Sequence, residues 1–409
     1  MSKPLDGVRI LEWAVWLAGP GAAMMLGDLG AEVIKIEQPK VGDPSRGLTQ
    51  LEGMRAGQRA RASVNAALYA GVNRNKKCIT VDVTKPKGKE IVYKLVQKCD
   101  VFLQNFRAEV RKEAQLDYDT LVKYNPKLIY VNVSSLGPYG PEAWRRGNDY
   151  VGQARSGFMT NFTGLLGEPA TMGSAIGDHM ASIMTVQGTL AALLAKERLG
   201  IGQEIDTSIV GSMIELQRIR MVNTAVLGEE VVRVNRKKAA NPLANHYKCK
   251  DGKWIGFCIL ASGIVWPDFC KAIGIENLQK DPRFESTEKR SQNCEALIEI
   301  LDNIFLTKKR DEWVEIVGKY HRIMFSPVLE GSEVLNDPQA LENKYVVEYD
   351  FPSLGGKIKT VGSAVNFHKT PAGIQAPAPE FGQHTEEVLL DLGGYTWEDI
   401  AKLKEEEVI

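Results

Sequence analysis

Apolar runs alternate with amphipathic stretches along the first half of the chain, and this alternation predicts strands that are each followed by a helix. The first unit has a strand over residues 8–13, a glycine-containing turn at 18–21, a helix over 22–29 and a second strand over 31–37. Strands are also predicted at 78–83, 100–104, 128–133 and 204–209, with helices at 88–98, 179–199 and 210–227. Alternating β and α elements indicate an α/β fold built on a large, doubly wound and mostly parallel sheet with helices on both faces.

The pattern changes after Gly228. Residues 233–238 are basic, Ala240-Asn241-Pro242 is typical of a boundary, and a hairpin-like segment follows at residues 247–255. A smaller α+β domain is therefore predicted over about residues 228–330, after a large domain over residues 1–227. Residues 331–409 have the composition of a folded segment, and residues 395–400 resemble the start of a capped final helix.

Composition limits the partners and the compartment. The 409 residues contain 51 Lys and Arg against 51 Asp and Glu, so no overall field draws the protein to nucleic acid or to an anionic membrane. The N-terminal residues lack the apolar core of a signal peptide, and the most apolar helical stretch, residues 182–194, is too short to span a bilayer. Six cysteines without CxxC spacing argue against a zinc site and a disulfide framework. A cytoplasmic location is expected.

The glycine turn after the first strand invites a dinucleotide-binding interpretation, because Glu37 lies close to the distance expected for a ribose contact. The turn reads Gly19-Pro20-Gly21-Ala22-Ala23-Met24. A methionine therefore occupies the third glycine position of GxGxxG, where close helix–strand packing needs a small residue. A tight turn that leads into a helix is the preferred interpretation.

Asp178, which follows Gly177 at the predicted start of the helix over residues 179–199, allows two interpretations. Aspartate is a preferred N-cap residue, and an apolar helix follows it directly. Alternatively, the carboxylate is an exposed and rigidly aimed nucleophile, beside which the glycine leaves space for a bulky thioester. Nearby backbone N–H groups would then stabilise an oxyanion. Periodicity does not separate the two interpretations.

Basic clusters lie near predicted strand ends, where α/β enzymes bind ligands. They are Arg74-Asn75-Lys76-Lys77, Arg111-Lys112 and Arg145-Arg146. Each is either a phosphate site or solvated surface. No histidine stands in an HExxH motif and no serine in a GxSxG motif, so metalloprotease and serine hydrolase chemistry have no support.

Eight motifs in a fixed order resemble the class III CoA-transferase family, whose members act on formyl-CoA and oxalate, carnitine, bile acids and aryl-lactates. The resemblance covers nearly the whole chain. Its motifs are Lys3-Pro4-Leu5-Asp6-Gly7-Val8-Arg9-Ile10-Leu11-Glu12, Ala18-Gly19-Pro20, Gly30-Ala31-Glu32-Val33-Ile34-Lys35-Ile36-Glu37, Asn75-Lys76-Lys77, Gln104-Asn105-Phe106, Asp149-Tyr150-Val151-Gly152-Gln153-Ala154 with Ser156-Gly157, Ile176-Gly177-Asp178 and Gly382-Gln383-His384-Thr385-Glu386-Glu387-Val388-Leu389.

The resemblance implies that Asp178 is the catalytic nucleophile. CoA would move from an acyl-CoA donor to a carboxylic acid through an aspartyl anhydride and an aspartyl-CoA thioester. Coenzyme A is then a substrate, with no tightly bound cofactor and no metal. The CoA contacts carried over by position are Leu17, Ala18, Val81, Asp82, Val83, Thr84, Asn105, Phe106, Arg107, Arg111, Arg146, Asn148 and Asp149. Gln38 and Glu113 replace basic residues of the family, and Arg111 or Lys112 is expected to substitute.

The resemblance also implies an interlocked homodimer in which residues 331–409 complete the large domain. The formate/oxalate enzymes of the family carry a run of glycines that closes over the aspartate. This run is missing before Tyr247, which favours an acyl group larger than formate or oxalate. The segment Asn241-Pro242-Leu243 followed by Tyr247-Lys248-Cys249-Lys250 most resembles the 2-hydroxyacid and aryl-lactate relatives. Two alternatives stay open. An α-methylacyl-CoA racemase shares the fold, but the histidine that it uses falls at Asn148, which cannot exchange a proton. The chain could also be the acyl-CoA-binding subunit of a heteromeric transferase.

Overall fold

The computed structural model describes residues 2–46, 63–173, 175–230 and 235–409. The chain divides into two compact units, which are described separately. The larger unit comprises Met1–Met159, Thr171–Glu230 and Leu341–Ile409, and the smaller one comprises Thr160–Ala170 and Val231–Ala340. The domain bounds predicted at residues 228 and 330 stay predictions. Residues 233 and 234 of the predicted basic segment lie outside the described residues.

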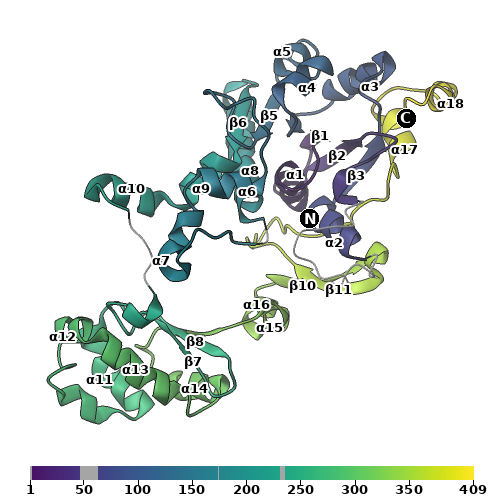
Figure 1. The fold of residues 1–409 in the computed structure, drawn as a ribbon. Coiled ribbons are helices and arrows are strands. Elements are labelled where there is room, and N and C mark those ends of the chain that lie inside the picture. The colour runs from purple at the N-terminus through teal and green to yellow at the C-terminus, as the bar shows by residue number, and fades with distance from the viewer. Residues whose placement is uncertain (1, 47–62, 174, 231–234) are drawn as a thin grey trace. The chain divides into compact units, whose positions relative to one another are not determined.

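A six-stranded parallel sheet forms the centre of the larger unit (Figure 1). Its strands are β1 (Arg9–Trp13), β2 (Glu32–Glu37), β3 (Lys76–Thr80), β4 (Val101–Gln104), β5 (Ile129–Ser134) and β6 (Glu204–Ser208). They lie in the order β3-β2-β1-β4-β5-β6, and every neighbouring pair is parallel. The α/β class and the parallel sheet predicted from the sequence are confirmed. The order of the strands reverses between β1 and β4, which defines a topological switch point.

Helices pack on both faces of this sheet. The helices of the larger unit are α1 (Ala18–Asp28), α2 (Ser63–Asn73), α3 (Pro86–Val96), α4 (Ala108–Glu113), α5 (Tyr118–Leu121), α6 (Asp149–Arg155), α8 (Ile176–Leu199), α9 (Ile209–Leu216), α10 (Arg218–Leu227), α17 (Thr385–Asp391) and α18 (Trp397–Glu405). Leu11 and Ile34 share a buried core with α3, α17 and α18. Their neighbours Ile10 and Val33 point to the other face, where α1 and α8 pack against each other and against the sheet.

Two helices differ from their predicted ranges. Helix α1 begins at Ala18 rather than residue 22, because the Gly-Pro-Gly segment is itself helical and proline is tolerated in a first turn. The helix predicted over residues 210–227 is two helices, α9 and α10, which meet at Gln217. The buried Gln217 side chain donates to the carbonyl oxygens of Met213 (2.9 Å) and Ser156 (3.3 Å). The break between α9 and α10 therefore coincides with a hydrogen bond to Ser156, which lies 61 positions before Gln217.

Residues 341–409 return to the larger unit. An antiparallel hairpin of β10 (Val346–Phe351) and β11 (Gly356–Val361) precedes α17 and α18. The predicted capped final helix is confirmed, because the Thr396 side chain accepts the Asp399 N–H in a capping box. None of the helices in the described ranges combines the length and apolar character needed to cross a membrane.

The smaller unit has an antiparallel sheet beside a bundle of helices. Its strands are β7 (His246–Lys248), β8 (Trp254–Phe257) and β9 (Phe325–Val328). Its helices are α7 (Thr163–Leu166), α11 (Ser262–Ile273), α12 (Thr287–Gln292), α13 (Cys294–Phe305), α14 (Arg310–Val317) and α15 (Gly331–Val334), with α16 (Pro338–Glu342) at its end. Strands β7 and β8 confirm the predicted hairpin. Aromatic and aliphatic side chains from the sheet and from α11, α13 and α14 form a separate core.

Candidate active site

The loops that follow β1 and β4 meet at the switch point of the sheet, where open α/β sheets bind ligands. Asn105 follows β4, and its side-chain amide makes two hydrogen bonds to the backbone of Val15, which follows β1. Its Oδ1 accepts the Val15 N–H (3.0 Å), and its Nδ2 donates to the Val15 carbonyl oxygen (2.7 Å). Asn105 therefore fixes one loop against the other, and these contacts use the amide that was predicted to bind CoA.

Trp16 lies in this loop with a left-handed backbone, at a φ angle of 70°. For a residue other than glycine such a conformation costs on the order of 1–3 kcal/mol and persists only where the surroundings impose it. Here the Trp16 N–H donates to Asp43 Oδ1 (3.2 Å), and Val15 is held by Asn105. Two contacts from distant parts of the chain thus impose the conformation of this turn, which we call the Trp16 turn (residues 14–17).

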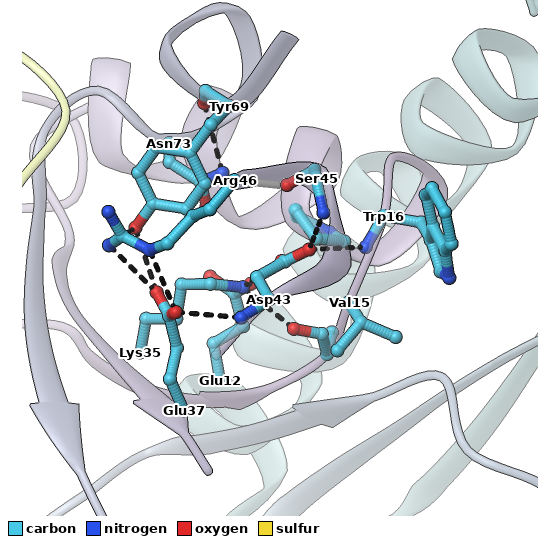
Figure 2. A network of polar contacts seen from close by, with 12 residues as sticks. Glu12, Val15, Trp16, Lys35, Glu37, Asp43, Ser45, Arg46, Tyr69 and Asn73 are labelled. Carbon is cyan, nitrogen blue, oxygen red and sulfur yellow. Dashed lines mark hydrogen bonds and ion pairs between the residues drawn. The ribbon is translucent and has the colours of Figure 1, made fainter. Parts of the chain in front are cut away.

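A buried ionic network lies beneath the Trp16 turn (Figure 2). Lys35 forms ion pairs with Glu12 and Asp43, both at 2.9 Å, and Lys76 pairs with Glu12 at 2.7 Å. All four side chains are fully buried. Lys35 also donates to the carbonyl oxygen of Ala14 (2.7 Å), which ties the network to the turn. Burial opposes the charge on Lys35, but the carboxylates of Glu12 and Asp43 outweigh it and raise the pKa of Lys35.

A second part of the network joins Glu37 to Arg46. The guanidinium of Arg46 makes two bonds to the Glu37 carboxylate, at 2.8 and 2.9 Å, and stacks on the Tyr69 ring. The Tyr69 hydroxyl also donates to Glu37 (2.9 Å), and the Asp43 N–H donates to its other oxygen (2.8 Å). Across both parts, the carboxylates of Glu12, Glu37 and Asp43 face the cations of Lys35, Lys76 and Arg46. The buried charges therefore balance. Glu37, the residue considered for ribose, has its carboxylate occupied.

Asp178 lies in the first turn of α8, and a different residue caps this helix. The N-cap position is Ala175, which has a left-handed backbone and makes no side-chain cap bond. Asp149, at the start of α6, reaches across: its Oδ1 accepts the N–H groups of Gly177 (2.6 Å) and Asp178 (3.2 Å). The interpretation of Asp178 as the N-cap is therefore wrong. These two N–H groups are also occupied, so they are not the oxyanion donors expected from the sequence.

Asp149 is itself held in place. Gln153, one turn along α6, donates from Nε2 to Asp149 Oδ2 (2.6 Å). The amide of Gln153, which is almost fully buried, also bonds the Met172 backbone in both directions, at 2.9 and 3.0 Å. A Cβ added to Gly177 would come within 2.9 Å of Asp149 Oδ1 and 2.8 Å of Ile209, so this close approach requires glycine. Gly177 thus serves the contact between α6 and α8.

The Asp178 carboxylate has no bonded partner among the described residues. It is half-buried, and this burial, together with the charge of Asp149, raises the pKa of Asp178 to about 7. Ser182, one turn along α8, donates to the carbonyl oxygen of Ala18 (2.8 Å). Residues four apart share a face of a helix, so Asp178 is directed toward the start of α1 and the loop before it. A strongly shifted carboxylate in a cavity is a candidate for chemistry.

Two adjoining cavities bring most of the predicted site residues together. A cavity of about 790 Å³ is lined by Leu17, Ala18, Asn105, Arg146, Asn148, Asp149 and Asp178, and also by Trp16. A cavity of about 510 Å³ is lined by Asn105, Phe106, Arg107, Arg111, Arg145 and Arg146, and also by Trp144. We call them the aspartate cavity and the arginine cavity. Asn105, Arg146 and residues 134, 135 and 147 line both, so the cavities are continuous.

The predicted segment from Val81 to Thr84 is not among the described residues that line either cavity. It follows β3, which lies two strands from β1 at the end of the sheet. Val81 is part of the core, the Asp82 N–H donates to the carbonyl oxygen of Val408 (2.7 Å), and Thr84 bonds the Asp82 side chain. Its role in binding CoA stays a prediction.

Sequence reasoning missed Trp16 and Gln153. A tryptophan three residues after an apolar strand was a visible signal, but its left-handed backbone has no local signature. Gln153 stood inside a family motif, yet only the fold places it between Asp149 and Met172. Asn148, by contrast, has a clear local role, because its side chain accepts the Val151 N–H and caps α6.

Comparison with known proteins agrees with this arrangement. The sequence pattern described as CoA-transferase family III matches residues 5–385. The chain belongs to this family. It is 32% identical to succinyl-CoA–D-citramalate CoA-transferase of Chloroflexus aurantiacus, over 100% of this chain and 98% of that one. It is 31% identical to (R)-2-hydroxy-4-methylpentanoate CoA-transferase of Clostridioides difficile, over 99% of both. A CAIB/BAIF family protein from Brucella suis has a similar structure, with a TM-score of 0.83 and 27% identity, covering 96% of this chain and 100% of that one.

Membership of CoA-transferase family III makes the chain a transferase enzyme that uses acyl-CoA as a substrate. Among the described residues, no group of three or more His, Cys, Asp and Glu side chains is arranged to hold a metal ion. The resemblance stated from the sequence motifs is confirmed at the level of the family.

Proposed function

We propose that this class III CoA-transferase moves CoA from an acyl-CoA donor to a carboxylic acid, with Asp178 as the covalent nucleophile. The observation that carries the proposal is an unpaired, half-buried carboxylate in the aspartate cavity, with a pKa near neutrality. Every neighbour that fixes the backbone around it bonds elsewhere: Asp149 to N–H groups and Ser182 to Ala18. The carboxylate is therefore positioned but unoccupied by protein contacts, as a nucleophile requires.

The chemistry follows in four steps that balance without a metal or a redox cofactor. An oxygen of Asp178 attacks the donor thioester carbonyl, and the C–S bond breaks to give an acyl-aspartyl anhydride and CoA thiolate. The thiolate attacks the aspartyl carbonyl, which releases the donor acid and leaves an aspartyl-CoA thioester. The acceptor carboxylate attacks this thioester and expels the thiolate again. Attack of the thiolate on the acceptor acyl carbon yields the new acyl-CoA and regenerates Asp178.

Coenzyme A is proposed to bind with its phosphates in the arginine cavity and its thiol end in the aspartate cavity. The arginine cavity contains four arginines against one acid, Glu109. Guanidinium groups are well suited to phosphates. Arg111 is mostly buried, and its guanidinium lies 4.0 Å from the Glu204 carboxylate, so its charge is proposed to contribute to phosphate binding. Phe106 stacks on Trp13 with ring centroids 4.2 Å apart, and its open side is proposed to pack against the adenine or pantetheine.

The acceptor is proposed to be a monocarboxylic acid of the 2-hydroxyacid or aryl-lactate type. The relatives named above act on a dicarboxylic acid in one case and on an apolar-bodied 2-hydroxyacid in the other. The described walls of the aspartate cavity are largely apolar, from Trp16, Leu17, Leu68 and Ile209. Asp149 already places a carboxylate there, and a second carboxylate on the substrate would be repelled by it.

Racemisation receives no added support. The position of the racemase histidine is Asn148, whose side-chain oxygen caps α6. Both oxygens of the adjacent Asp149 accept hydrogen bonds from Gly177, Asp178 and Gln153. A base that removes the α-proton must be free to accept it, and neither residue meets this condition.

The enzyme is also proposed to be a cytoplasmic, interlocked homodimer. All six cysteines are free thiols, which suits a reducing compartment. Helix α10 has no buried residue, and Ile219, Val222, Val226 and Leu227 on it are 56–78% exposed in the single chain. An apolar face of this kind is typical of an interaction surface. Light scattering on the purified protein tests the dimer, and a charged substitution such as Val226→Glu is expected to weaken it.

The function is tested by incubating the purified protein with a panel of acyl-CoA donors and acids, trapping with hydroxylamine or borohydride, and mapping adducts by peptide mass spectrometry. Modification of Asp178 that requires a donor, with CoA transfer to one acid, supports the proposal, and the Asp178→Asn variant is the control. Binding of CoA esters without an adduct, together with exchange of the α-proton in D₂O, would falsify it and favour a racemase. Binding without either reaction would favour a binding subunit.

A further inference from the structure

Trp16 combines three properties that are rarely found together. It lies in the loop after β1, its backbone is left-handed, and its side chain is 44% exposed. Its indole points away from the ionic network, as Figure 2 shows, and it lines the aspartate cavity with Asp178. Strained backbone conformations are concentrated at ligand-contacting positions, so this outlier calls for a functional explanation.

The buried ionic network fixes the backbone that carries the Trp16 indole. Asp43, which accepts the Trp16 N–H, also accepts the Ser45 N–H (2.9 Å) and pairs with the fully buried Lys35. Lys35 in turn holds the Ala14 carbonyl oxygen. The Trp16 turn is thus held by buried charges below it and by Asn105 beside it. Because the backbone of the Trp16 turn is already fixed, the Trp16 indole can contact a ligand in the cavity with little loss of conformational entropy.

The described residues that line the aspartate cavity with Trp16 include apolar side chains and two carboxylates. Val15, Leu17, Leu68 and Ile209 line the cavity with it. Among the described lining residues the one cation is Arg146, which also lines the arginine cavity. An apolar wall cannot replace the hydration of a carboxylate, whereas it gains from contact with an aliphatic or aromatic body.

We propose that Trp16 determines acyl specificity: its indole is the wall against which the apolar body of the acyl group packs while the acyl carbon meets Asp178. The enzyme thereby prefers acyl groups with an aromatic or branched body over acetyl and over groups that end in a second carboxylate. This inference rests on the proposed transferase function and adds the residue that selects the substrate class.

The test measures the first half-reaction, in which Asp178 is modified, with three donors that share the same CoA. They are 3-phenylpropanoyl-CoA, acetyl-CoA and glutaryl-CoA, so any ratio of their second-order rate constants reports the acyl part alone. The wild-type constant for the phenyl donor is expected to exceed the other two by about 10–100-fold, the range that apolar pockets achieve. Trp16→Ala is expected to reduce this ratio below about 3-fold, and Trp16→Phe to retain most of it.

Trp397→Ala is the matched control, because Trp397 is also exposed, at 65%, but begins α18 away from the site. It should leave all three constants unchanged. A wild-type preference for glutaryl-CoA, or a ratio that Trp16→Ala does not change, overturns this inference while leaving the transferase proposal intact. An equal loss for all three donors in Trp16→Ala also overturns it, since Trp16 would then support the fold or CoA binding. Failure of every donor to modify wild-type Asp178 overturns the transferase proposal and this inference together.

Discussion

Buried charges are arranged in opposite ways in two neighbouring regions of the larger unit. Beneath the Trp16 turn, three carboxylates face three cations, and the ion pairs are 2.7–2.9 Å long. At the start of α8, Asp178 has a carboxylate as its charged neighbour, and burial together with the charge of Asp149 raises the pKa of Asp178. The first arrangement holds a loop in an unfavourable conformation, and the second leaves a carboxylate without a counter-charge. Balanced burial therefore supports structure here, while unbalanced burial has a cost in stability that the proposed chemistry would explain.

The largest effect is expected at Glu12, in the balanced network. Glu12→Gln removes the carboxylate that lies between Lys35 and Lys76. Because burial already lowers the pKa of Lys76 to about 8 against the opposing effect of Glu12, two buried ammonium groups would lose their shared counter-charge. We expect the free energy of unfolding to fall by about 3–5 kcal/mol, as measured by urea denaturation.

The matched control is Glu407→Gln. Glu407 forms an ion pair of the same length, 2.9 Å, with Lys40, but both side chains are about two-thirds exposed. This substitution should change the free energy of unfolding by at most about 1 kcal/mol. Equal losses in the two variants would show that the buried network contributes no more than a surface pair.

A smaller effect of opposite sign is expected at Asp178. Asp178→Asn removes a carboxylate that is costly to ionise in the folded protein, so we expect a gain of about 1–3 kcal/mol near pH 8. This value is below the roughly 4 kcal/mol that the full shift would give at about 1.4 kcal/mol per unit, since the side chain is partly exposed. CoA transfer should fall by at least about 10⁴-fold.

The pH dependence of this gain in stability separates the effect of the Asp178 charge from an effect of side-chain shape. The folded pKa of Asp178 is raised, to about 7, from an ordinary value near 3.8. Between these values the folded wild type retains a proton that the unfolded chain has lost, so wild-type stability falls relative to Asp178→Asn as the pH rises through this window. The gain should be absent near pH 4 and constant above about pH 7. Thermal unfolding of both proteins across this range measures it, with the exposed Asp391→Asn as a control, and a gain that is independent of pH would contradict the account.

Apolar runs were sufficient to predict the central strands β1, β2, β4 and β5, because these strands are short and almost fully buried. The apolar pattern was insufficient at Gln217, where the helix pattern is continuous and a contact with Ser156 accompanies the break. The same limit applies at the site. The cap of α8 comes from Asp149, 29 positions before Asp178, and the strained turn at Trp16 depends on Asp43 and Asn105. Motif order predicted Asp178 as the nucleophile, which stays a prediction, whereas the residues that position its carboxylate are visible only in three dimensions.

The smallest and most specific effect is expected at Asp149. The rate constant for modification of Asp178 by a donor should rise with pH up to about 7 in the wild type, since only the ionised carboxylate attacks. Asp149→Asn removes the neighbouring charge but retains an oxygen that can accept the Gly177 N–H. The pKa of Asp178 should therefore fall toward its usual range, and the acidic limb of the profile should move to lower pH.

Gln153→Met provides the matched comparison, because it removes the hydrogen bond to Asp149 Oδ2, along with the two bonds to the Met172 backbone, while keeping the Asp149 charge and the side-chain volume. This variant is expected to modify Asp178 more slowly at every pH, by roughly 10-fold for the loss of one positioning bond, with the acidic limb unmoved. An acidic limb that stays in place in Asp149→Asn would mean that burial alone sets the pKa of Asp178. Asp149 would then lie next to Asp178 only because it caps the helix that carries Asp178. The difference between this site and the balanced network would be one of desolvation rather than of charge.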